Sequence, residues 1–253
     1  LYNYILWKIR FFSLVINKKE KSALKVLKKQ GIVVIENFYS EKNCNELREN
    51  LSQKINNKDK HFHVWKSQDG SDSRLFGVDR IDYSFEAFYQ NKFILNVISS
   101  YEKSNKFDGF TLGSSLEYTE NNLGSGGGWH RDRLDSHQTK AMLYLSDVGE
   151  KEGPFQYLYG SHKPRNKIWD HLFFKINIDE TRYSDTQVNR LIHKRYKTKI
   201  YAAKKGTLII FDSSGLHRGT PIKSKNKRYS LTNYFWFNQK IPDHIRSLLQ
   251  KRA

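Results

Sequence analysis

The chain has 253 residues, of which 38% are hydrophobic and 14% aromatic, and its 44 Lys and Arg against 26 Asp and Glu give a formal charge of +18. The aromatic content excludes a disordered chain, and the single cysteine, Cys44, excludes an intrachain disulfide and a cysteine-rich zinc site. The length suits one domain with a sizeable core. We therefore expect residues 1–253 to form a single domain.

The positive charge is concentrated at the two ends of the chain. Residues 1–29 hold eight basic residues and one acidic residue, whereas residues 30–162 hold 15 basic and 19 acidic residues. Residues 163–253 hold 21 basic and six acidic residues. Clustered cations attract anions, so the pattern predicts an anionic partner such as a phospholipid surface, a nucleic acid or an anionic substrate. Solvated basic faces without a partner explain the same counts equally well.

The N-terminal segment, residues 1–30, is predicted to be helical, basic and apolar. Its first 16 residues are apolar or aromatic at 12 positions, which is too short and too interrupted for a membrane span of about 20 residues. It either lies on an anionic membrane surface through residues 1–29 or packs on the domain. The only methionine is Met142, so we expect the true N-terminus to precede Leu1. The expected location is the cytoplasm, with peripheral membrane contact as the alternative.

The first half of the chain reads mainly as helices. A basic amphipathic helix is predicted over residues 19–29, ended by Gly31, and a buried β-branched strand over residues 32–35. Ser40 is the expected N-cap of the next helix, which runs to about Ile55. A polar loop over residues 56–77 and a helix over residues 84–102 follow.

From Gly109 onward the pattern changes to short β-branched or alternating segments separated by turn residues. A helical or irregular insertion is expected over residues 166–196, and a terminal helix over residues 242–251. The predicted fold class is mainly β with flanking helices. The predicted strands are residues 111–118, 140–145, 199–203, 207–211 and 229–237.

Three side chains suggest a metal site. His130 and Asp132 are two residues apart, which on a strand places both on one face, and His217 follows the apolar strand that ends at Phe211. Two histidines and one carboxylate with open positions form the facial triad of non-haem Fe(II) oxygenases. A His-x-Asp pair alone is weak evidence, because a surface histidine beside a solvated acid gives the same pattern.

Arg228 strengthens this interpretation. It lies 11 residues after His217 at the start of a predicted strand on which Arg228, Ser230 and Thr232 share one face. A fixed guanidinium beside a hydroxyl can hold a carboxylate through two hydrogen bonds, which arginine does better than lysine.

With these residues in register, the sequence resembles the phytanoyl-CoA dioxygenase (PhyH) family of Fe(II)/2-oxoglutarate-dependent dioxygenases. The resemblance implies a double-stranded β-helix, a cupin-like jelly-roll with the iron at its mouth. It covers most of the chain and rests on residues 31–38, Trp129-His130-Arg131-Asp132, residues 144–147, Gly153-Pro154-Phe155, Gly160-Ser161-His162 and the span from His217 to Arg228.

The resemblance also implies roles for single residues. His130, Asp132 and His217 are then the catalytic iron ligands, and Arg228 with Ser230 binds the distal carboxylate of 2-oxoglutarate. Lys140 and Tyr144 lie on the strand after the motif, where inward-facing residues are expected to contact the co-substrate. Arginines that border the family's pocket are expected to contact the substrate, and here these are Arg131, Arg74 and Arg80.

The implied activity uses Fe(II), 2-oxoglutarate and O₂ to hydroxylate a C–H bond, with release of succinate and CO₂. Because the carboxylate of Asp132 is present, hydroxylation is favoured over halogenation. The expected substrate is a small or lipid- or sugar-linked anionic molecule. Two alternatives remain: an oxygenase acting on nucleic acid or protein, with nucleic acid the less favoured partner, and a non-catalytic β-helix binding protein.

Overall fold

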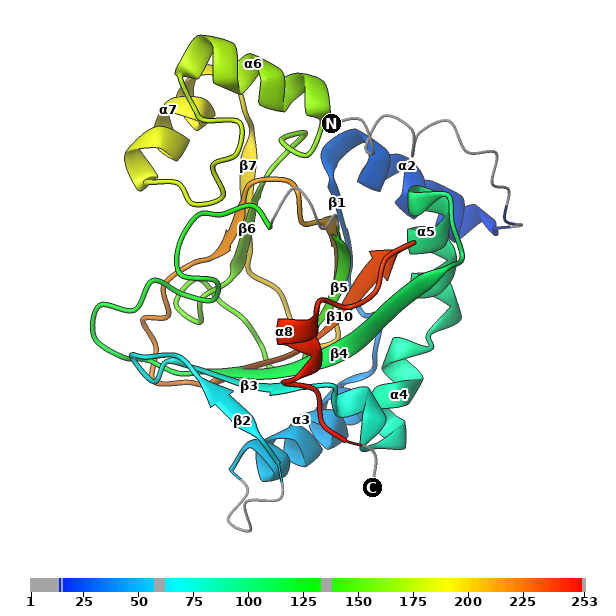
Figure 1. Ribbon diagram of the computed structural model, residues 1–253. Coiled ribbons are helices and arrows are strands. Elements are labelled where there is room, and N and C mark those ends of the chain that lie inside the picture. Colours follow the sequence, from blue (N-terminus) through cyan, green and yellow to red (C-terminus); the bar gives the residue numbers. More distant parts are fainter. Residues whose placement is uncertain (1–13, 15, 57–61, 133–137, 252–253) are drawn as a thin grey trace.

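Two antiparallel sheets pack against one another and form the body of the protein (Figure 1). The computed structural model describes residues 14, 16–56, 62–132 and 138–251. The large sheet has the order β1-β8-β5-β10-β4-β3-β2, and the small sheet has the order β7-β6-β9. The strands are β1 (Ile32–Ile35), β2 (Val64–Lys66), β3 (Asp72–Phe76), β4 (Phe107–Leu116), β5 (Gln138–Tyr144), β6 (Phe155–Leu158), β7 (Thr198–Tyr201), β8 (Leu208–Asp212), β9 (His217–Gly219) and β10 (Arg228–Phe237).

One group of helices covers the outer face of the large sheet, and a second group lies next to the small sheet. The first group, α2 to α5, packs on the large sheet, and the second group, α6 and α7, lies between β6 and β7 in the chain. They are α2 (Lys18–Gln30), α3 (Glu41–Ile55), the 3₁₀ helix η1 (Val78–Arg80), α4 (Tyr83–Tyr89), α5 (Lys92–Glu102), α6 (Pro164–Phe174), α7 (Asp185–Lys194) and the short α8 (Asp243–Arg246).

Alternation along β10 separates the two faces of the large sheet. Leu231 and Phe235 point to the outer face and join the core beneath the helices. The alternate residues of β10 point toward the small sheet; they are Arg228, Ser230, Thr232, Tyr234 and Trp236. There Tyr144 and Phe211 pack against Tyr157 of β6. The predicted mainly-β class is confirmed, and the double-stranded β-helix leaves a polar space between its two sheets.

Local signals placed several elements correctly. Asn17 and Glu20 form a capping box at the start of α2, and Gly31 ends this helix at φ +84°, a conformation that glycine adopts without strain. Ser40 caps α3 by accepting a hydrogen bond from the Asn43 amide at 3.2 Å, as expected.

Three predictions of secondary structure were wrong. The expected loop over residues 56–77 contains β2 and β3, because β3 pairs with β4 and β2 then adds to β3 as the edge strand of the sheet. The helix expected over residues 84–102 is two helices, because Asn91 turns the chain and caps α5. The terminal helix is only one turn long, with Pro242 as its N-cap.

The membrane predictions for the first residues fall mostly outside the described part of the chain, since residues 1–13 and 15 are not described. Within residues 14, 16–56, 62–132 and 138–251, none of the helices combines the length and the apolar character that a transmembrane span requires.

Candidate metal centre and co-substrate cavity

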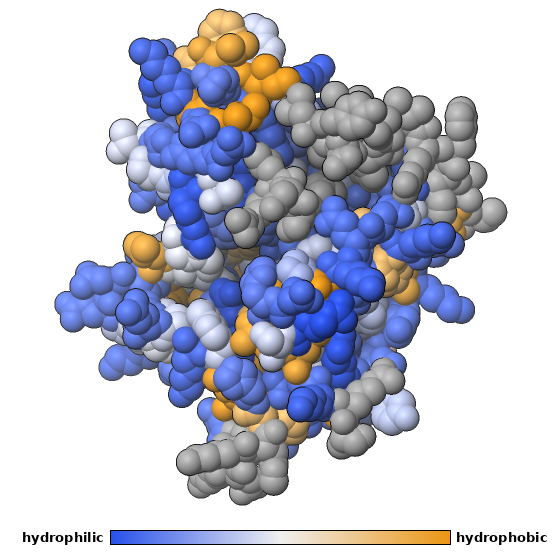
Figure 2. Space-filling view, viewed as in Figure 1, coloured by the Kyte–Doolittle hydropathy of each residue, from blue (hydrophilic) through white to orange (hydrophobic). Residues whose placement is uncertain are grey.

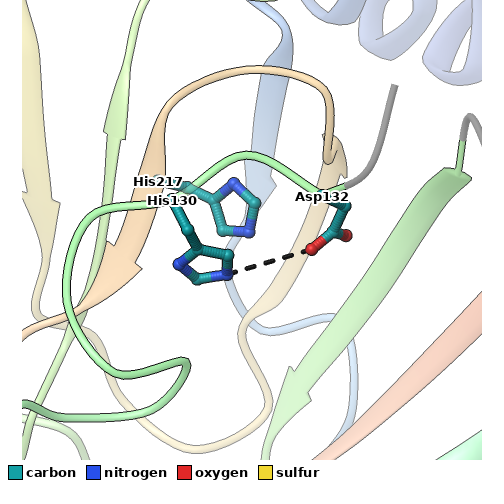
Figure 3. Close-up of side chains that lie close together, drawn as sticks. All are labelled: His130, Asp132 and His217. Carbon is teal, nitrogen blue, oxygen red and sulfur yellow. Dashed lines mark ion pairs between the residues drawn. The ribbon is translucent and has the colours of Figure 1, made fainter. Parts of the chain in front are cut away.

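His130, Asp132 and His217 come together at one end of the space between the sheets (Figure 3). One ligand atom from each lies within 4.8 Å of the others. The backbone explains the convergence: His130 and His217 exchange two amide-to-carbonyl hydrogen bonds of 3.0 Å, and the Asp132 amide donates to the Ser213 carbonyl at 3.0 Å. An antiparallel bridge therefore joins segments that are 87 residues apart in the chain.

Both imidazoles are held with one nitrogen free for a metal. His130 Nδ1 is 2.9 Å from the Gly128 carbonyl and His217 Nδ1 is 2.8 Å from the Gly215 carbonyl, so each Nδ1–H donates and each Nε2 keeps its lone pair. Burial lowers the pKa of His130, and it lowers the pKa of His217 to about 3. Both rings are therefore neutral at physiological pH, as metal ligation requires.

Asp132 supplies the negative ligand. Burial raises the pKa of this carboxyl, but the charge and the hydrogen bond of Lys140 act against burial, and the pKa is lowered overall. Its Oδ2 is 2.5 Å from Lys140 Nζ, and its Oδ1 is 3.9 Å from His130 Nε2. Two neutral imidazoles and an ionised carboxylate are the donor set of a non-haem Fe(II) site, so these residues fit the metal.

A glycine-rich loop packs directly on His130. A Cβ at Gly126 would overlap the His130 imidazole, whereas a Cβ at Gly128 would meet open space. Both glycines have positive φ, +84° and +88°. From the other side, Arg182 donates to the carbonyls of Gly126 and Gly127. The loop therefore fixes the position of the ligand as well as its tautomer.

A cavity of about 210 Å³ extends from the three ligands along the inner faces of the large sheet. Arg228, Ser230, Thr232 and Tyr234 line it from β10, because residues two apart share a face. Ser114 of β4 also lines it and lies 2.9 Å from Ser230, Oγ to Oγ. Sequence reasoning did not find Ser114, since only the register of β4 against β10 brings it opposite Ser230.

Arg228 is a buried cation of this cavity, six residues along β10 from Tyr234, which lies opposite the Lys140 that contacts Asp132. Its side chain is 3% exposed, one guanidinium nitrogen donates to the Gly153 carbonyl, and its Nε has no partner among the described residues. Burial lowers the pKa of Arg228. In the described part of the chain no carboxylate lies within ion-pair distance of it. A buried guanidinium with a free donor and two neighbouring hydroxyls fits the carboxylate of a 2-oxo acid.

Lys140 and Tyr144 lie on β5 with different surroundings. Lys140 lines the cavity, and its ammonium contacts Asp132 and lies 4.2 Å from the centre of the Tyr234 ring. The Tyr144 hydroxyl accepts a hydrogen bond from the Phe155 amide at 2.9 Å and donates to the Tyr201 carbonyl at 3.2 Å. Its ring lies beneath Arg228, 6.0 Å from the guanidinium carbon. Tyr144 therefore supports Arg228, and its hydroxyl is engaged by the backbone.

The three arginines proposed for the substrate lie in different places. Arg74 lines the cavity, pairs with Asp72 at 2.6 Å and stacks on Trp65. Arg131 is turned away: it is 5% exposed and donates to the Ser161 and Ser214 carbonyls and to the Tyr183 hydroxyl. Arg80 lines another surface hollow, beside α4 and the C-terminal residues. The placements of Arg131 and Arg80 give no support to substrate contact, whereas that of Arg74 suits it.

Arg182 is a cavity residue that the sequence did not reveal. It follows α6 and reaches the cavity through an isolated bridge between its backbone and that of His130. Nothing in its local sequence distinguishes it from the other basic residues of the insertion, because its position depends on how the insertion folds back over the glycine-rich loop.

A second hollow of about 360 Å³ adjoins the cavity at its metal end. The two share Arg74, Asp132, Lys140 and Tyr234. Aromatic rings of Phe76, Phe110 and Trp236 form much of its remaining wall, and Pro242, His244 and Ile245 border it from the C-terminal segment. The Phe110 and Tyr234 rings stack with centroids 5.1 Å apart.

Comparisons with known proteins agree with this geometry. The family model described as Phytanoyl-CoA dioxygenase (PhyH) matches residues 27–230. No curated protein matches the sequence.

Among solved structures, the fold is similar to three enzymes at low sequence identity. The non-heme alpha ketoglutarate dependent epimerase SnoN from nogalamycin biosynthesis has a TM-score of 0.65 at 12% identity, over 87% of this chain and 83% of that chain. The non-heme alpha ketoglutarate dependent carbocyclase SnoK from the same biosynthesis has a TM-score of 0.63 at 13% sequence identity, over 94% of this chain and 93% of that chain. HygX from Streptomyces hygroscopicus, with nickel, 2-oxoglutarate and hygromycin B bound, has a TM-score of 0.59 at 13% sequence identity, over 88% of each chain.

Proposed function

Because this chain belongs to the phytanoyl-CoA dioxygenase (PhyH) family, we propose that it is an Fe(II)- and 2-oxoglutarate-dependent oxygenase that hydroxylates a C–H bond of a small anionic molecule. One observation carries the proposal. The His130, Asp132 and His217 cluster lines the same cavity as the buried Arg228, whose Nε has no partner among the described residues. Arg228 is six residues along β10 from Tyr234, which lies opposite Lys140 near the cluster. This arrangement suits a co-substrate that has a metal-binding head and a distal carboxylate.

Iron would be held at the metal end by His130 Nε2, His217 Nε2 and the Asp132 carboxylate. The Gly128 and Gly215 carbonyls keep both Nδ1 protonated, so the free Nε2 atoms point to the metal. When bound, iron, 2-oxoglutarate and O₂ supply the oxidation of a C–H bond, with succinate and CO₂ as co-products. The protein's own contribution is to orient the ligands and to keep the site enclosed.

The distal end recognises the co-substrate by charge and hydrogen bonding. Arg228 offers its free Nε and its positive charge, and Ser230 with Ser114 offers hydroxyls on the same wall. Tyr144 supports the guanidinium from below. Because Arg228 is buried, a bound carboxylate would replace a missing counter-ion, which makes this contact strong. Lys140 is assigned to the metal end of the co-substrate, where its ammonium lies beside Asp132.

The substrate is proposed to enter through the second hollow. A cavity of about 210 Å³ is smaller than the roughly 300–1,000 Å³ of most ligand pockets, so the co-substrate takes up much of it. The hollow of about 360 Å³ reaches one of the proposed metal ligands, Asp132, which lines both spaces. Its aromatic wall suits an apolar part of the substrate. Two cations of the joined cavities are not assigned to the co-substrate, Arg74 and Arg182, and they suit an anionic part of the substrate.

The first experiment tests the cofactors. Fe(II) and 2-oxoglutarate are added to the protein without oxygen, and visible absorption is recorded. We expect the weak charge-transfer band of a chelated 2-oxo acid, followed by slow succinate formation when oxygen is admitted. Arg228→Ala should lose the band at low 2-oxoglutarate concentration and regain it at high concentration. Absence of both band and succinate in the unmodified protein would overturn the proposal.

The second experiment tests the reaction type. Succinate formation is measured across a panel of small carboxylates, phosphates and sulfates, and the products of stimulating compounds are weighed by mass spectrometry. Gain of one oxygen atom supports hydroxylation. An unchanged mass would indicate epimerisation, and loss of two hydrogens would indicate ring closure or desaturation. Stimulation only by a nucleic acid or a protein would replace the small-molecule proposal.

A further inference from the structure

Helix α6 exposes its apolar face. Ile168, Trp169, Leu172 and Phe173 are 38%, 50%, 64% and 57% exposed, and they lie on one side of the helix because they follow its spacing of one, three and four residues. Trp169 and Phe173 stack on each other with ring centroids 4.3 Å apart. Figure 2 shows apolar side chains gathered at the top of the molecule, over α6. We call Ile168, Trp169, Leu172 and Phe173 the α6 apolar face.

The opposite side of α6 is held to the protein by charge. Asp170 is 1% exposed, accepts a hydrogen bond from the Tyr196 hydroxyl at 2.7 Å and pairs with Arg131 and Arg195 at 3.5 and 3.6 Å. A helix on a water-facing surface normally buries its apolar side and exposes its charges. In α6 the apolar side is exposed and a charged residue is buried, which is unfavourable if the exposed side contacts only water.

Basic residues surround the α6 apolar face. Residues 163–199 contain ten Lys or Arg and four Asp or Glu, and one of the four acids is the buried Asp170. The Arg195 guanidinium lies 5.6 Å from the Trp169 ring, and that of Arg190 lies 5.6 Å from the Phe174 ring. Apart from Arg182, which lines the metal cavity, the exposed cations of residues 163–199 are Arg165, Lys175, Arg190, Lys194, Lys197 and Lys199.

The basic helix α2 lies at the same end of the molecule (Figure 1). The Gly160 amide donates to the Gln30 carbonyl at 2.7 Å, and Asn166 of α6 donates to the Gly160 carbonyl at 2.8 Å. These two bonds join the end of α2 to the start of α6. Six lysines of α2 are exposed, namely Lys18, Lys19, Lys21, Lys25, Lys28 and Lys29.

From these observations we infer that the α6 apolar face inserts into the surface of an anionic phospholipid membrane, with the surrounding cations on the headgroups. Trp, Phe and Leu on one side of a helix with Lys and Arg around them are typical of interfacial helices. Each lysine or arginine near an anionic surface adds to the attraction. Protein interfaces are instead depleted in lysine, so the lysine-rich rim favours lipid over a protein partner.

The test is sedimentation of the full chain with vesicles. Vesicles of phosphatidylcholine with phosphatidylserine are compared with vesicles of phosphatidylcholine alone, at low and high salt. The variant Leu172→Ser/Phe173→Ser removes two exposed apolar side chains from α6. The matched control, Tyr83→Ser/Tyr118→Ser, removes two exposed aromatic side chains, 89% and 52% exposed, from elsewhere on the surface. Circular dichroism verifies that both variants are folded.

We expect binding to the anionic vesicles only, and weaker binding at high salt. The α6 variant should bind at least about tenfold more weakly, since two large apolar side chains no longer leave water, and the control variant should bind as the unmodified chain does. Equal binding by the unmodified chain and the α6 variant would overturn the inference. So would a chain that ignores vesicles but self-associates in sedimentation equilibrium and loses that association in the α6 variant.

Discussion

The two ends of the cavity are built in different ways. At the metal end, His130 and His217 are brought together by a backbone bridge between distant segments, and each is fixed by a nearby carbonyl. At the distal end, Arg228 and Ser230 are neighbours on one strand, and strand alternation alone places them side by side. The metal end therefore depends on loops and tertiary contacts, whereas the distal end depends on the regularity of β10.

The two ends also solve opposite electrostatic problems. The metal end keeps the partly buried His130 and the buried His217 neutral and needs a cation from outside. The distal end keeps a buried guanidinium without a carboxylate partner among the described residues and needs an anion from outside. Each end should therefore lose its own ligand when it is altered, and leave the other ligand bound.

The largest expected effect concerns the metal ligands. His130→Ala, Asp132→Ala and His217→Ala should each weaken Fe(II) binding by at least about 100-fold, because each removes a donor from a set of three. Anaerobic calorimetric titration with Fe(II) measures the affinity. His162→Asn serves as the control, since His162 is buried outside the cluster. Stoichiometric iron at unchanged affinity in any of the three ligand variants would contradict the assignment.

The next effect separates the two ends. Arg228→Ala should weaken 2-oxoglutarate binding by about 100-fold with Fe(II) affinity unchanged, because a buried charged hydrogen bond is lost. Arg228→Lys should have a 2-oxoglutarate affinity between those of the unmodified protein and Arg228→Ala, since lysine keeps the charge but loses the planar pair of donors. Titration of the Fe(II)-loaded variants with 2-oxoglutarate measures the 2-oxoglutarate affinities, and anaerobic titration with Fe(II) measures the iron affinities. Equal loss of iron in Arg228→Ala and in the ligand variants would show that the two ends are not independent.

A pH effect is expected from His162, a buried histidine outside the metal cluster. Burial lowers the pKa of His162 to about 4, and Gly31 lies against both this ring and the Tyr157 hydroxyl. The folded pKa is below the unfolded value of about 6.5, so the unfolded chain takes up the proton first, and stability is lost as pH falls from about 6.5 toward about 4.

Chemical denaturation of the metal-free protein at a series of pH values tests this effect. His162→Gln should be less stable than the unmodified protein near neutral pH, and the difference should shrink by about 2 kcal/mol as the pH falls to about 4.5. A difference that stays constant across this range would mean that His162 does not contribute to the acid sensitivity.

The smallest effect concerns the glycine-rich loop. Gly126→Ala places a methyl group against the His130 ring, so Fe(II) affinity should fall by about tenfold through displacement of the ligand. Gly128→Ala is the matched control, because its φ is also positive but its added methyl group meets open space. Anaerobic Fe(II) titration compares them. Equal affinities in the two variants would show that backbone strain, and not the contact with His130, is what matters.

The sequence was informative wherever a local rule applied. The Asn17 and Ser40 caps, the Gly31 stop and the β-branched strand after it depend on a few adjacent residues, and these elements could be predicted. The face shared by Arg228, Ser230 and Thr232 follows from strand alternation in the same way. The family and its fold were also recognisable, because the motif residues occur in a fixed order along the chain.

Other features depend on which segments meet in space. The polar β2 and β3 became strands only because the edge of the large sheet offered them partners. Ser114 lies opposite Ser230 through the register of β4 and β10, and Arg182 reaches the cavity because the insertion folds over the glycine-rich loop. Arg131, adjacent to a ligand in sequence, is turned away by partners that come from distant parts of the chain.

By itself, then, the sequence determined the class of fold and the strand that holds Arg228, and it predicted the candidate metal ligands, because these follow from residue chemistry and short spacing. The tertiary structure alone decided which cations face the cavity, where the second hollow lies and that α6 turns its apolar side outward. The physical reason is that a side chain's direction and its charge partners depend on contacts between distant segments, as the burial of Asp170 with Arg131 and Arg195 shows.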